Sequence, residues 1–241
     1  MPKVAIIAAL EREVKPAVRG WRVTEREYGG RRFKFFESER AVLLCGGIGP
    51  EAARRATETA IALYEPALVM SVGFAGALEK ELRIGDIFCP QKVVDAQDGS
   101  SVDAGGSAGI LVTVASIASS GQKEKLARAY GAQAVDMEAA AVARGAQARG
   151  VRFMTVKAIS DESDFDMPEL DRFIREEKFR TTSFVAWTAF RPWLWLKVMR
   201  LARNSSKATQ ALSRWLSEYD YQVENEDTPE PGLHLIMRSK T

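Results

Sequence analysis

Continuous apolar runs alternate with amphipathic stretches along the first two thirds of the chain. Residues 3–10 (KVAIIAAL), 66–73 (PALVMSVG) and 109–116 have the composition of buried strands. Residues 51–64 and 123–130 have the composition and spacing of helices. Buried strands separated by helices are typical of α/β proteins, so this pattern predicts an α/β fold.

Two shorter strand-like segments follow the first run. Residues 32–39 (RFKFFESE) and 41–47 (AVLLCGG) come after the Gly29-Gly30 turn and predict a pair of strands. Residues 84–96 predict one or two more. Residues 97–109 (QDGSSVDAGGSAG) are polar and rich in glycine and serine, so we expect a mobile loop there.

Residues 134–161 form the most informative stretch of the chain. An apolar run leads to Asp136 and Glu138, an alanine-rich helical pattern ends at Gly150, and a second strand-like run ends at Asp161. The length suits a βαβ crossover, and each strand would bring a carboxylate to its carboxyl end, where open α/β sheets bind ligands. We interpret these acids as functional; the alternative is that they only cap helices.

The pattern changes after Asp161. Residues 168–190 predict a long helix that is broken at Arg191-Pro192. Residues 193–219 combine tryptophan, leucine and basic residues at helical spacing, which predicts one amphipathic helix or a helix pair broken near Asn204. These helices pack on the sheet, or their tryptophans meet a membrane surface or an apolar substrate. We expect one domain over residues 1–218 and a polar, poorly ordered tail over 219–241.

Composition excludes several classes of protein. The 241 residues are 46% hydrophobic and 27% charged, with a formal net charge of +2, which argues against a chain-wide nucleic-acid surface. The two cysteines, Cys45 and Cys89, rule out a disulfide framework, and the single histidine, His234, leaves no His-based triad or His-rich metal site. The first apolar run is too short for a signal peptide or a membrane span, so we expect a cytoplasmic protein.

Three acids follow three different predicted strands: Glu13, Glu138 and Asp161. If those strands are neighbours in a mostly parallel sheet, the three carboxylates meet in one cleft. Such a trio is suited to binding a divalent metal through oxygen ligands or to cleaving a glycosidic bond. Residue types alone leave both chemistries open.

A glycine loop precedes the helix at residues 51–64. Gly47, Ile48 and Gly49 would allow an anion or a sugar hydroxyl to approach the helix N-terminus. The loop lacks the Lys-Ser/Thr pair of a Walker motif, which argues against a nucleoside triphosphate site. A tight turn without a ligand is an equally good interpretation.

Four motifs in order give the chain a family resemblance: residues 6–14 (IIAALEREV), 47–53 (GIGPEAA), 134–141 (AVDMEAAA) and 158–161 (AISD). They resemble the nucleoside phosphorylase/nucleosidase superfamily, above all the 5′-methylthioadenosine/S-adenosylhomocysteine nucleosidases. The resemblance implies a three-layer α/β/α sandwich around a central mixed, mostly parallel sheet, assembled as a homodimer or larger homo-oligomer. It implies no cofactor and no metal, with inorganic phosphate as co-substrate if the reaction is phosphorolytic.

The resemblance also implies roles for single residues. Glu13 would activate the attacking water, and Asp161, oriented by Ser160, would protonate purine N7. Glu138 would bind the ribose hydroxyls, with Met137 packed against the sugar.

Other implied substrate contacts include departures from the family pattern. Phe74, Ala75 and Gly76 would lie beside the nucleoside, and Ile117 and Ala118 would contact the purine. Phe74 replaces the usual small hydroxyl residue, and Ile117 replaces the usual aromatic ring. In these departures, in its short middle region and in the RPW…LAR helix, the chain resembles hopanoid-associated phosphorylases. This resemblance implies adenosylhopane as an alternative substrate.

We therefore expect an enzyme that cleaves the N-glycosidic bond of an adenine nucleoside, by hydrolysis or by phosphorolysis. Its partners would be a small purine nucleoside and a second copy of the chain, with peripheral membrane contact through the Trp-rich helices and no nucleic acid. An alternative from another class is an inactive nucleoside-binding or membrane-associated module that has inherited the fold.

Overall fold

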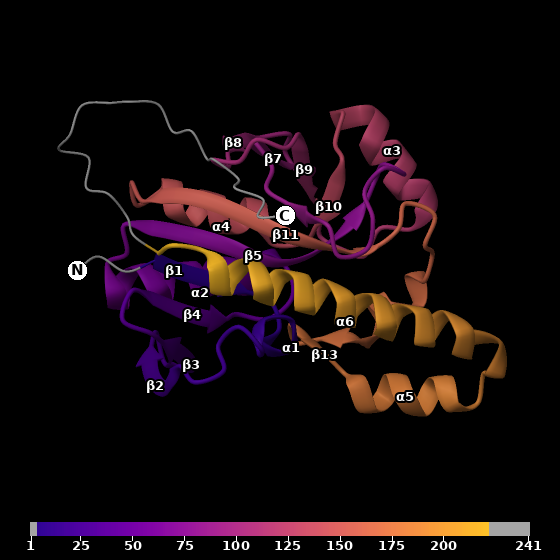
Figure 1. Ribbon diagram of the computed structural model, residues 1–241, viewed down its shortest axis with the longest axis horizontal. Coiled ribbons are helices and arrows are strands. Elements are labelled where there is room, and N and C mark those ends of the chain that lie inside the picture. The colour runs from indigo at the N-terminus through magenta and orange to yellow at the C-terminus, as the bar shows by residue number, and fades with distance from the viewer. Residues whose placement is uncertain (1–3, 222–241) are drawn as a thin grey trace.

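The computed structural model describes residues 4–221, which form an 11-stranded mixed sheet, a two-stranded sheet and the helices around them (Figure 1). In chain order the elements are β1 (Val4–Ala8), α1 (Glu11–Val14), β2 (Arg22–Tyr28), β3 (Arg31–Glu37), β4 (Ala41–Cys45), α2 (Pro50–Tyr64), β5 (Leu68–Ala77), β6 (Ile87–Phe88), β7 (Lys92–Asp95), β8 (Ser101–Asp103), β9 (Ile110–Thr113), α3 (Ser120–Tyr130), β10 (Ala134–Asp136), α4 (Ala139–Gln147), β11 (Arg152–Asp161), the 3-10 helix η1 (Pro168–Phe173), β12 (Ile174–Arg175), β13 (Lys178–Phe179), α5 (Thr181–Ala189), the 3-10 helix η2 (Pro192–Leu194) and α6 (Trp195–Glu218).

The large sheet has the order β2-β3-β4-β1-β5-β10-β9-β7-β8, and β11 pairs with β5 and β6. Strands β4, β1, β5 and β11 are parallel neighbours, and so are β10, β9 and β7. The β2–β3–β4 meander, the β7–β8 hairpin and the β5–β10 pair are antiparallel. The sheet is therefore mixed with a mostly parallel centre, as predicted.

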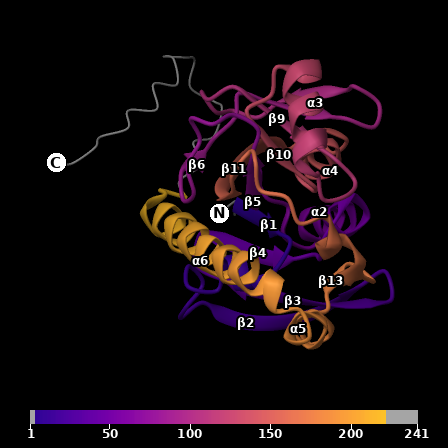
Figure 2. The same cartoon turned by 90° about the vertical axis from the view of Figure 1, so that its right-hand side faces the viewer.

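The side chains of β1 show how the two faces of the sheet are covered. Val4, Ile6 and Ala8 lie in one apolar cluster with α6, whereas Ala5 and Ile7 lie in another with α2 and α4. Successive side chains of a strand point to opposite faces of the sheet, which explains this alternation. Because both faces are covered by helices, every residue of β1 is apolar. Figure 2 shows α6 on one side of the strands and α2 and α4 on the other, which confirms the three-layer sandwich.

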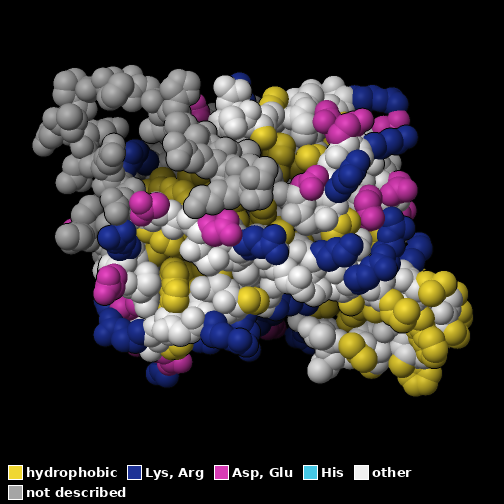
Figure 3. Space-filling model, in the orientation of Figure 1, with side chains coloured by type: hydrophobic (Ala, Val, Ile, Leu, Met, Phe, Trp, Pro, Cys, Tyr) yellow, Lys and Arg dark blue, Asp and Glu magenta, His cyan; other side chains and the backbone are white. Residues whose placement is uncertain are grey.

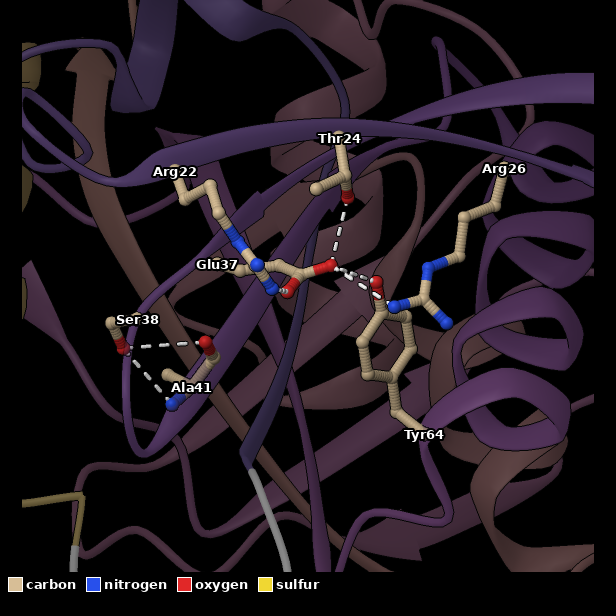
Figure 4. A network of polar contacts seen from close by, with 7 residues as sticks. All are labelled: Arg22, Thr24, Arg26, Glu37, Ser38, Ala41 and Tyr64. Carbon is tan, nitrogen blue, oxygen red and sulfur yellow. Dashed lines mark hydrogen bonds and ion pairs between the residues drawn. The ribbon is translucent and has the colours of Figure 1, made fainter.

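A polar network fastens the β2–β3 edge to α2 (Figure 4). The buried Glu37 carboxylate accepts hydrogen bonds from Tyr64 Oη at 2.6 Å, Thr24 Oγ1 at 2.7 Å and Arg22 Nη2 at 2.5 Å. Burial opposes ionisation of Glu37, but these donors outweigh it and lower its pKa to about 2. This network lies on the edge of the sheet remote from β10 and β9, so we assign it a structural role.

The expected βαβ crossover at residues 134–161 differs from the observed unit in its strand directions. Strands β10 and β11 and helix α4 are present, but β10 is antiparallel to β5 while β11 is parallel to it. Both strands border β5, and Gly76 pairs with Val135 on one side and Asp161 on the other. The two carboxyl ends therefore meet at one residue of β5, although the strands are not a parallel pair.

Two other expectations were wrong in part. The polar segment 97–109 contains strand β8, which pairs with β7. Residues 168–190 are not one long helix, because a 3-10 helix and the β12–β13 hairpin precede α5. Glu176 and Glu177 turn this hairpin with φ of 51° and 65°, a conformation that ends any helix. Apolar packing of Phe179 against Phe173 and Phe184 accompanies the hairpin and outweighs helix propensity.

Helix α6 is continuous, without a break at Asn204, which is buried and donates to Glu162 Oε2 at 3.3 Å. Its inner face packs Ala208, Leu212 and Leu216 onto the sheet. In the described range 4–221, no helix is both long enough and apolar enough to cross a bilayer. The expected polar tail falls largely on residues 222–241, outside the described residues, as does His234.

We predict that Leu212→Ala destabilises the fold by about 2 to 5 kcal/mol, because Leu212 is fully buried between α6 and the sheet and its loss leaves a cavity. Urea denaturation followed by circular dichroism measures this free energy of unfolding. The matched control is Arg214→Ala, which removes an exposed side chain from the same helix. Equal stability of the two variants would contradict the assignment of α6 to the core.

Candidate active site

One cavity of about 610 Å³ lies where β1, β5, β10 and β11 end. Its wall contains most of the residues predicted from the sequence: Glu13, Ile48, Phe74, Ala75, Gly76, Ile117, Ala118, Met137, Glu138, Ser160 and Asp161. Gly47 and Gly49 flank Ile48 and are not part of the wall. The structure thus brings the three predicted acids together in one site.

Glu13 lies on the short helix α1, directly after β1, and is buried. Among the described residues, no hydrogen-bond partner reaches its Oε2 atom. Burial, followed by the negative charge of Glu138, raises the pKa of Glu13 to about 8. A buried carboxyl oxygen is costly unless it finds a partner, so Oε2 is ready to accept a proton or bind a water in the cavity.

Lys157 provides a buried positive charge beneath the acids. Its Nζ lies 2.8 Å from Asp136 Oδ2 and 3.2 Å from Ser71 Oγ. Asp136 also accepts from Thr113 Oγ1 at 2.6 Å and from the Ala139 amide at 2.8 Å, so its oxygens are engaged by the protein. Burial alone lowers the pKa of Lys157, but Asp136 and the neighbouring glutamates outweigh it and raise the pKa. Lys157 and Asp136 thus form a buried ion pair, and we assign Asp136 a structural role.

Glu138 lies at the start of α4, where its Oε1 atom accepts from the Gly49 amide at 2.9 Å. Burial, with the charge of Asp136 added, raises its pKa to about 7. The carboxyl group is therefore fixed through one oxygen while Glu138 lines the cavity. That arrangement suits a group that binds hydroxyls, although its role toward ribose stays a prediction.

The glycine loop has its amides occupied by the protein. The Gly47 amide donates to Ala9 O at 3.1 Å, Ile48 to Glu177 O at 2.7 Å and Gly49 to Glu138. Any anion bound there would have to replace these acceptors. The loop positions Glu138 and contacts the β12–β13 hairpin; its predicted role toward phosphate or water stays a prediction.

Asp161 ends β11 on the opposite side of the cavity. Its Oδ1 accepts from Ser160 Oγ at 2.8 Å, and its Oδ2 lies against Gly76, where an added Cβ would approach to 2.7 Å. Glycine at position 76 is therefore required for this carboxylate position. The second partner of Oδ2 is the Lys123 ammonium, from α3.

Sequence reasoning missed Lys123. Its side chain is 3% exposed and lines the cavity, and its Nζ donates to Glu162 O at 2.7 Å as well as to Asp161. In the sequence it is one basic residue of a short polar helix that also carries Lys125 and Arg128. Nothing in that pattern distinguishes the inward-facing lysine from its exposed neighbours.

An apolar wall was also missed. It comes from residues 165–185 and from α6: Phe165, Met167, Leu170, Ile174, Phe179, Phe184, Val198 and Leu201. The cavity is therefore polar at the sheet and apolar beneath the α5–α6 hairpin. Within residues 4–221, no group of three or more His, Cys, Asp or Glu side chains is placed to hold a metal ion. Proton transfer by carboxyl groups is the chemistry that this arrangement offers.

Comparisons with known proteins agree with this class of α/β protein. The family model described as "Phosphorylase superfamily" matches residues 3–109 and 107–185. A 5′-methylthioadenosine/S-adenosylhomocysteine nucleosidase of Actinobacillus succinogenes is 29% identical over 202 residues, covering 67% of this chain and 86% of that enzyme. Its counterpart in Marinomonas sp. is 32% identical over 98 residues, 39% of this chain and 42% of the relative.

Solved structures share the fold. The same nucleosidase from Helicobacter pylori superposes with a TM-score of 0.68 at 20% identity, covering 89% of this chain and 96% of that one. Helicobacter pylori futalosine hydrolase gives 0.66 at 20% identity, covering 89% and 95%. The Neisseria meningitidis nucleosidase bound to methylthio-immucillin-A gives 0.67 at 20% identity, covering 90% and 97%. The chain belongs to the phosphorylase superfamily.

The buried Glu13 carboxyl predicts a pH-dependent stability. Its pKa rises from 4.5 to about 8 on folding, mainly through burial, so the folded protein retains a proton that the unfolded chain releases. This contribution is fully present below the unfolded pKa of 4.5 and is lost as the pH rises through about 8. The free energy of unfolding should therefore fall with pH more steeply in the wild type than in Glu13→Gln.

Urea denaturation at several pH values measures both slopes. Glu138 contributes in the same direction in both proteins, so the difference between the slopes reports on Glu13. Parallel slopes would show that Glu13 is ionised in the folded protein at neutral pH.

Proposed function

We propose that the protein cleaves the N-glycosidic bond of a purine nucleoside. The observation that carries this proposal is that Glu13, Glu138 and Asp161 line one cavity, where Glu13 and Glu138 follow strands on one edge of β5 and Asp161 ends the strand on its other edge. Membership of the phosphorylase superfamily and the names of the similar nucleosidases support it.

In this mechanism the C1′–N9 bond breaks and its electron pair stays with the purine. Asp161 delivers a proton to N7, which makes the base a better leaving group. Glu138 binds the ribose hydroxyls, and the carboxylates stabilise the positive charge that develops on the sugar. A water attacks C1′ and gives a proton to Glu13 in its ionised form, whose population increases as the pH rises toward the Glu13 pKa of about 8. Hydrolysis is favoured over phosphorolysis because, within residues 4–221, no donor pairs with Glu13 Oε2, while the loop amides are occupied.

We expect Glu13→Gln and Asp161→Asn each to lower kcat by about 100-fold to 10,000-fold, because each removes one proton-transfer group. Methylthioadenosine, adenosylhomocysteine, adenosine and inosine are incubated with and without phosphate, and the base and sugar are separated by chromatography. Free sugar indicates hydrolysis, and sugar 1-phosphate indicates phosphorolysis. The control is Glu11→Gln on the same helix, whose carboxylate pairs with Lys34 instead.

Full turnover by Asp161→Asn would contradict the leaving-group assignment. Release of no base by the wild type, even from an adenine nucleoside with a long apolar 5′ group, would leave the inactive binding module as the better description.

The 5′ substituent of the substrate would be apolar. The wall formed by Phe165, Leu170 and Phe184 extends the cavity away from the acids and toward α6. A methylthio group suits it in chemical type, and a larger hydrocarbon such as that of adenosylhopane is the alternative. Comparing kcat/KM for adenosine and for 5′-alkylthioadenosines of increasing chain length tests this: kcat/KM should rise with the chain if the wall binds it.

The α5–α6 hairpin would contact a membrane surface. Six of the eight exposed large hydrophobic side chains in the described residues lie here: Val185, Phe190, Trp193, Trp195, Leu196 and Met199. They form the apolar projection at the lower right of Figure 3. From Lys178 to Ser217 the sequence has eight basic and no acidic residues. An apolar tip on a segment whose charged side chains are all basic is complementary to an anionic lipid surface.

We predict that the protein sediments with phosphatidylglycerol-containing vesicles and that Trp193→Ser/Leu196→Ser weakens this binding by about tenfold or more. The matched control is Val23→Ser/Tyr28→Ser, which removes exposed apolar side chains from β2. Binding that is unchanged in the hairpin variant would contradict the membrane contact. Sedimentation velocity tests whether the wild type is a dimer. If the hairpin variant loses that dimer, the tip is instead a contact between two copies of the chain. The homodimer itself stays a prediction.

A further inference from the structure

Lys123 is a buried charged group of the cavity that the mechanism above does not use. Lysine is rarely buried unless its charge is paired, and the Lys123 side chain is 3% exposed. Its ammonium group reaches across from α3 to the end of β11, where it contacts the Asp161 carboxylate and donates to Glu162 O at 2.7 Å. The lysine is therefore directed at the group that must protonate the leaving base.

The other acids near this ammonium group have partners of their own, so Asp161 is its ion-pair partner. The Glu162 side chain faces Arg200 at 3.0 Å and Asn204 at 3.3 Å, and Asp136 is paired with Lys157. Among the ion pairs of residues 4–221, Asp161 is the carboxylate that Lys123 meets.

Because of this pairing, Asp161 needs a source for the proton that it delivers to the purine. The Ser160 hydroxyl and the Lys123 ammonium both donate to Asp161, and both stabilise the charged form of a carboxylate. A carboxylate held by two such donors must receive a proton before it can pass one to a purine. Of the two donors, the Lys123 ammonium is a stronger acid than the Ser160 hydroxyl and is therefore the better proton source.

We propose that Lys123 is the proton source for the departing purine and acts through Asp161. As the C1′–N9 bond breaks, its electron pair moves into the purine and N7 takes a proton from the Asp161 carboxyl. Asp161 receives that proton from Lys123, which becomes a neutral amine. The attacking water transfers one proton to Glu13, so one proton is gained and one is lost within the cavity; exchange with solvent restores both groups. This proposal rests on the proposed function.

Lys123 is thus a positioning and proton-supplying residue, and its loss should matter only when the base needs a proton. A purine nucleoside methylated at N7 already carries positive charge on the base and leaves without protonation. The experiment compares base release from methylthioadenosine and from its N7-methylated derivative by the wild type, Lys123→Met, Lys123→Arg and the control Lys125→Met. Lys125 lies on the same helix and is exposed.

We expect Lys123→Met to lower kcat on methylthioadenosine by about 100-fold while kcat on the N7-methylated nucleoside stays close to the wild-type value. Lys123→Arg should recover only part of the loss, because arginine provides the charge but does not give up its proton. Lys125→Met should match the wild type on both substrates. Thermal melting followed by circular dichroism establishes that each variant is folded.

An equal loss on both substrates would overturn the proposal and make Lys123 a structural residue. Full recovery of kcat by Lys123→Arg would also overturn the proposal that Lys123 supplies a proton, because a positive charge alone would then be sufficient. If Lys123→Met does not fold, Lys123→Gln is compared on the same two substrates. Release of no base by the wild type from either substrate contradicts the proposed function rather than the role of Lys123.

Discussion

The buried ion pair between Lys157 and Asp136 is the interaction on which the rest of the site depends. Glu13, Asp136 and Glu138 converge at one cavity, where their burial makes like charges repel strongly. One ammonium ion, 2.8 Å from Asp136, offsets part of this repulsion. Its removal would leave buried carboxylates uncompensated, a large destabilisation compared with any exposed ion pair. Burial, with the neighbouring negative charges added, still raises the pKa values of Glu13 and Glu138, which suits groups that exchange protons.

Strand β5 places the remaining acid opposite this cluster. Gly76 pairs with Val135 on β10 and with Asp161 on β11, so two strands of opposite direction end at the same point. A side chain at position 76 would collide with the Asp161 carboxylate. The cavity therefore has glutamates on one side and the Ser160–Asp161–Lys123 group on the other. In the proposed mechanism a substrate between them would meet a base and an acid at once, an arrangement suited to glycosidic bond cleavage.

The second half of the cavity is made by a part of the chain that departs from a plain α/β sandwich. The η1 helix, the β12–β13 hairpin and α5 contribute aromatic and aliphatic side chains, and α6 completes the wall. The same α5–α6 hairpin exposes tryptophan and leucine at its outer end. Apolar wall and apolar tip thus belong to one element, which connects the proposed choice of 5′ substituent with the proposed membrane contact.

Local pattern was enough to predict the α/β class, most strands, and the positions of Glu13, Glu138 and Asp161. Each acid lies at or within a few residues of the end of an apolar run, and that relation is local to the chain. The tertiary structure decided what local pattern does not contain: the reversed direction of β10, the hairpin within residues 168–180, and the inward turn of Lys123. Strand direction depends on which neighbour a strand pairs with, and a lysine is buried only where a distant carboxylate compensates its charge. Both depend on residues far apart in the chain, which only the folded protein brings together.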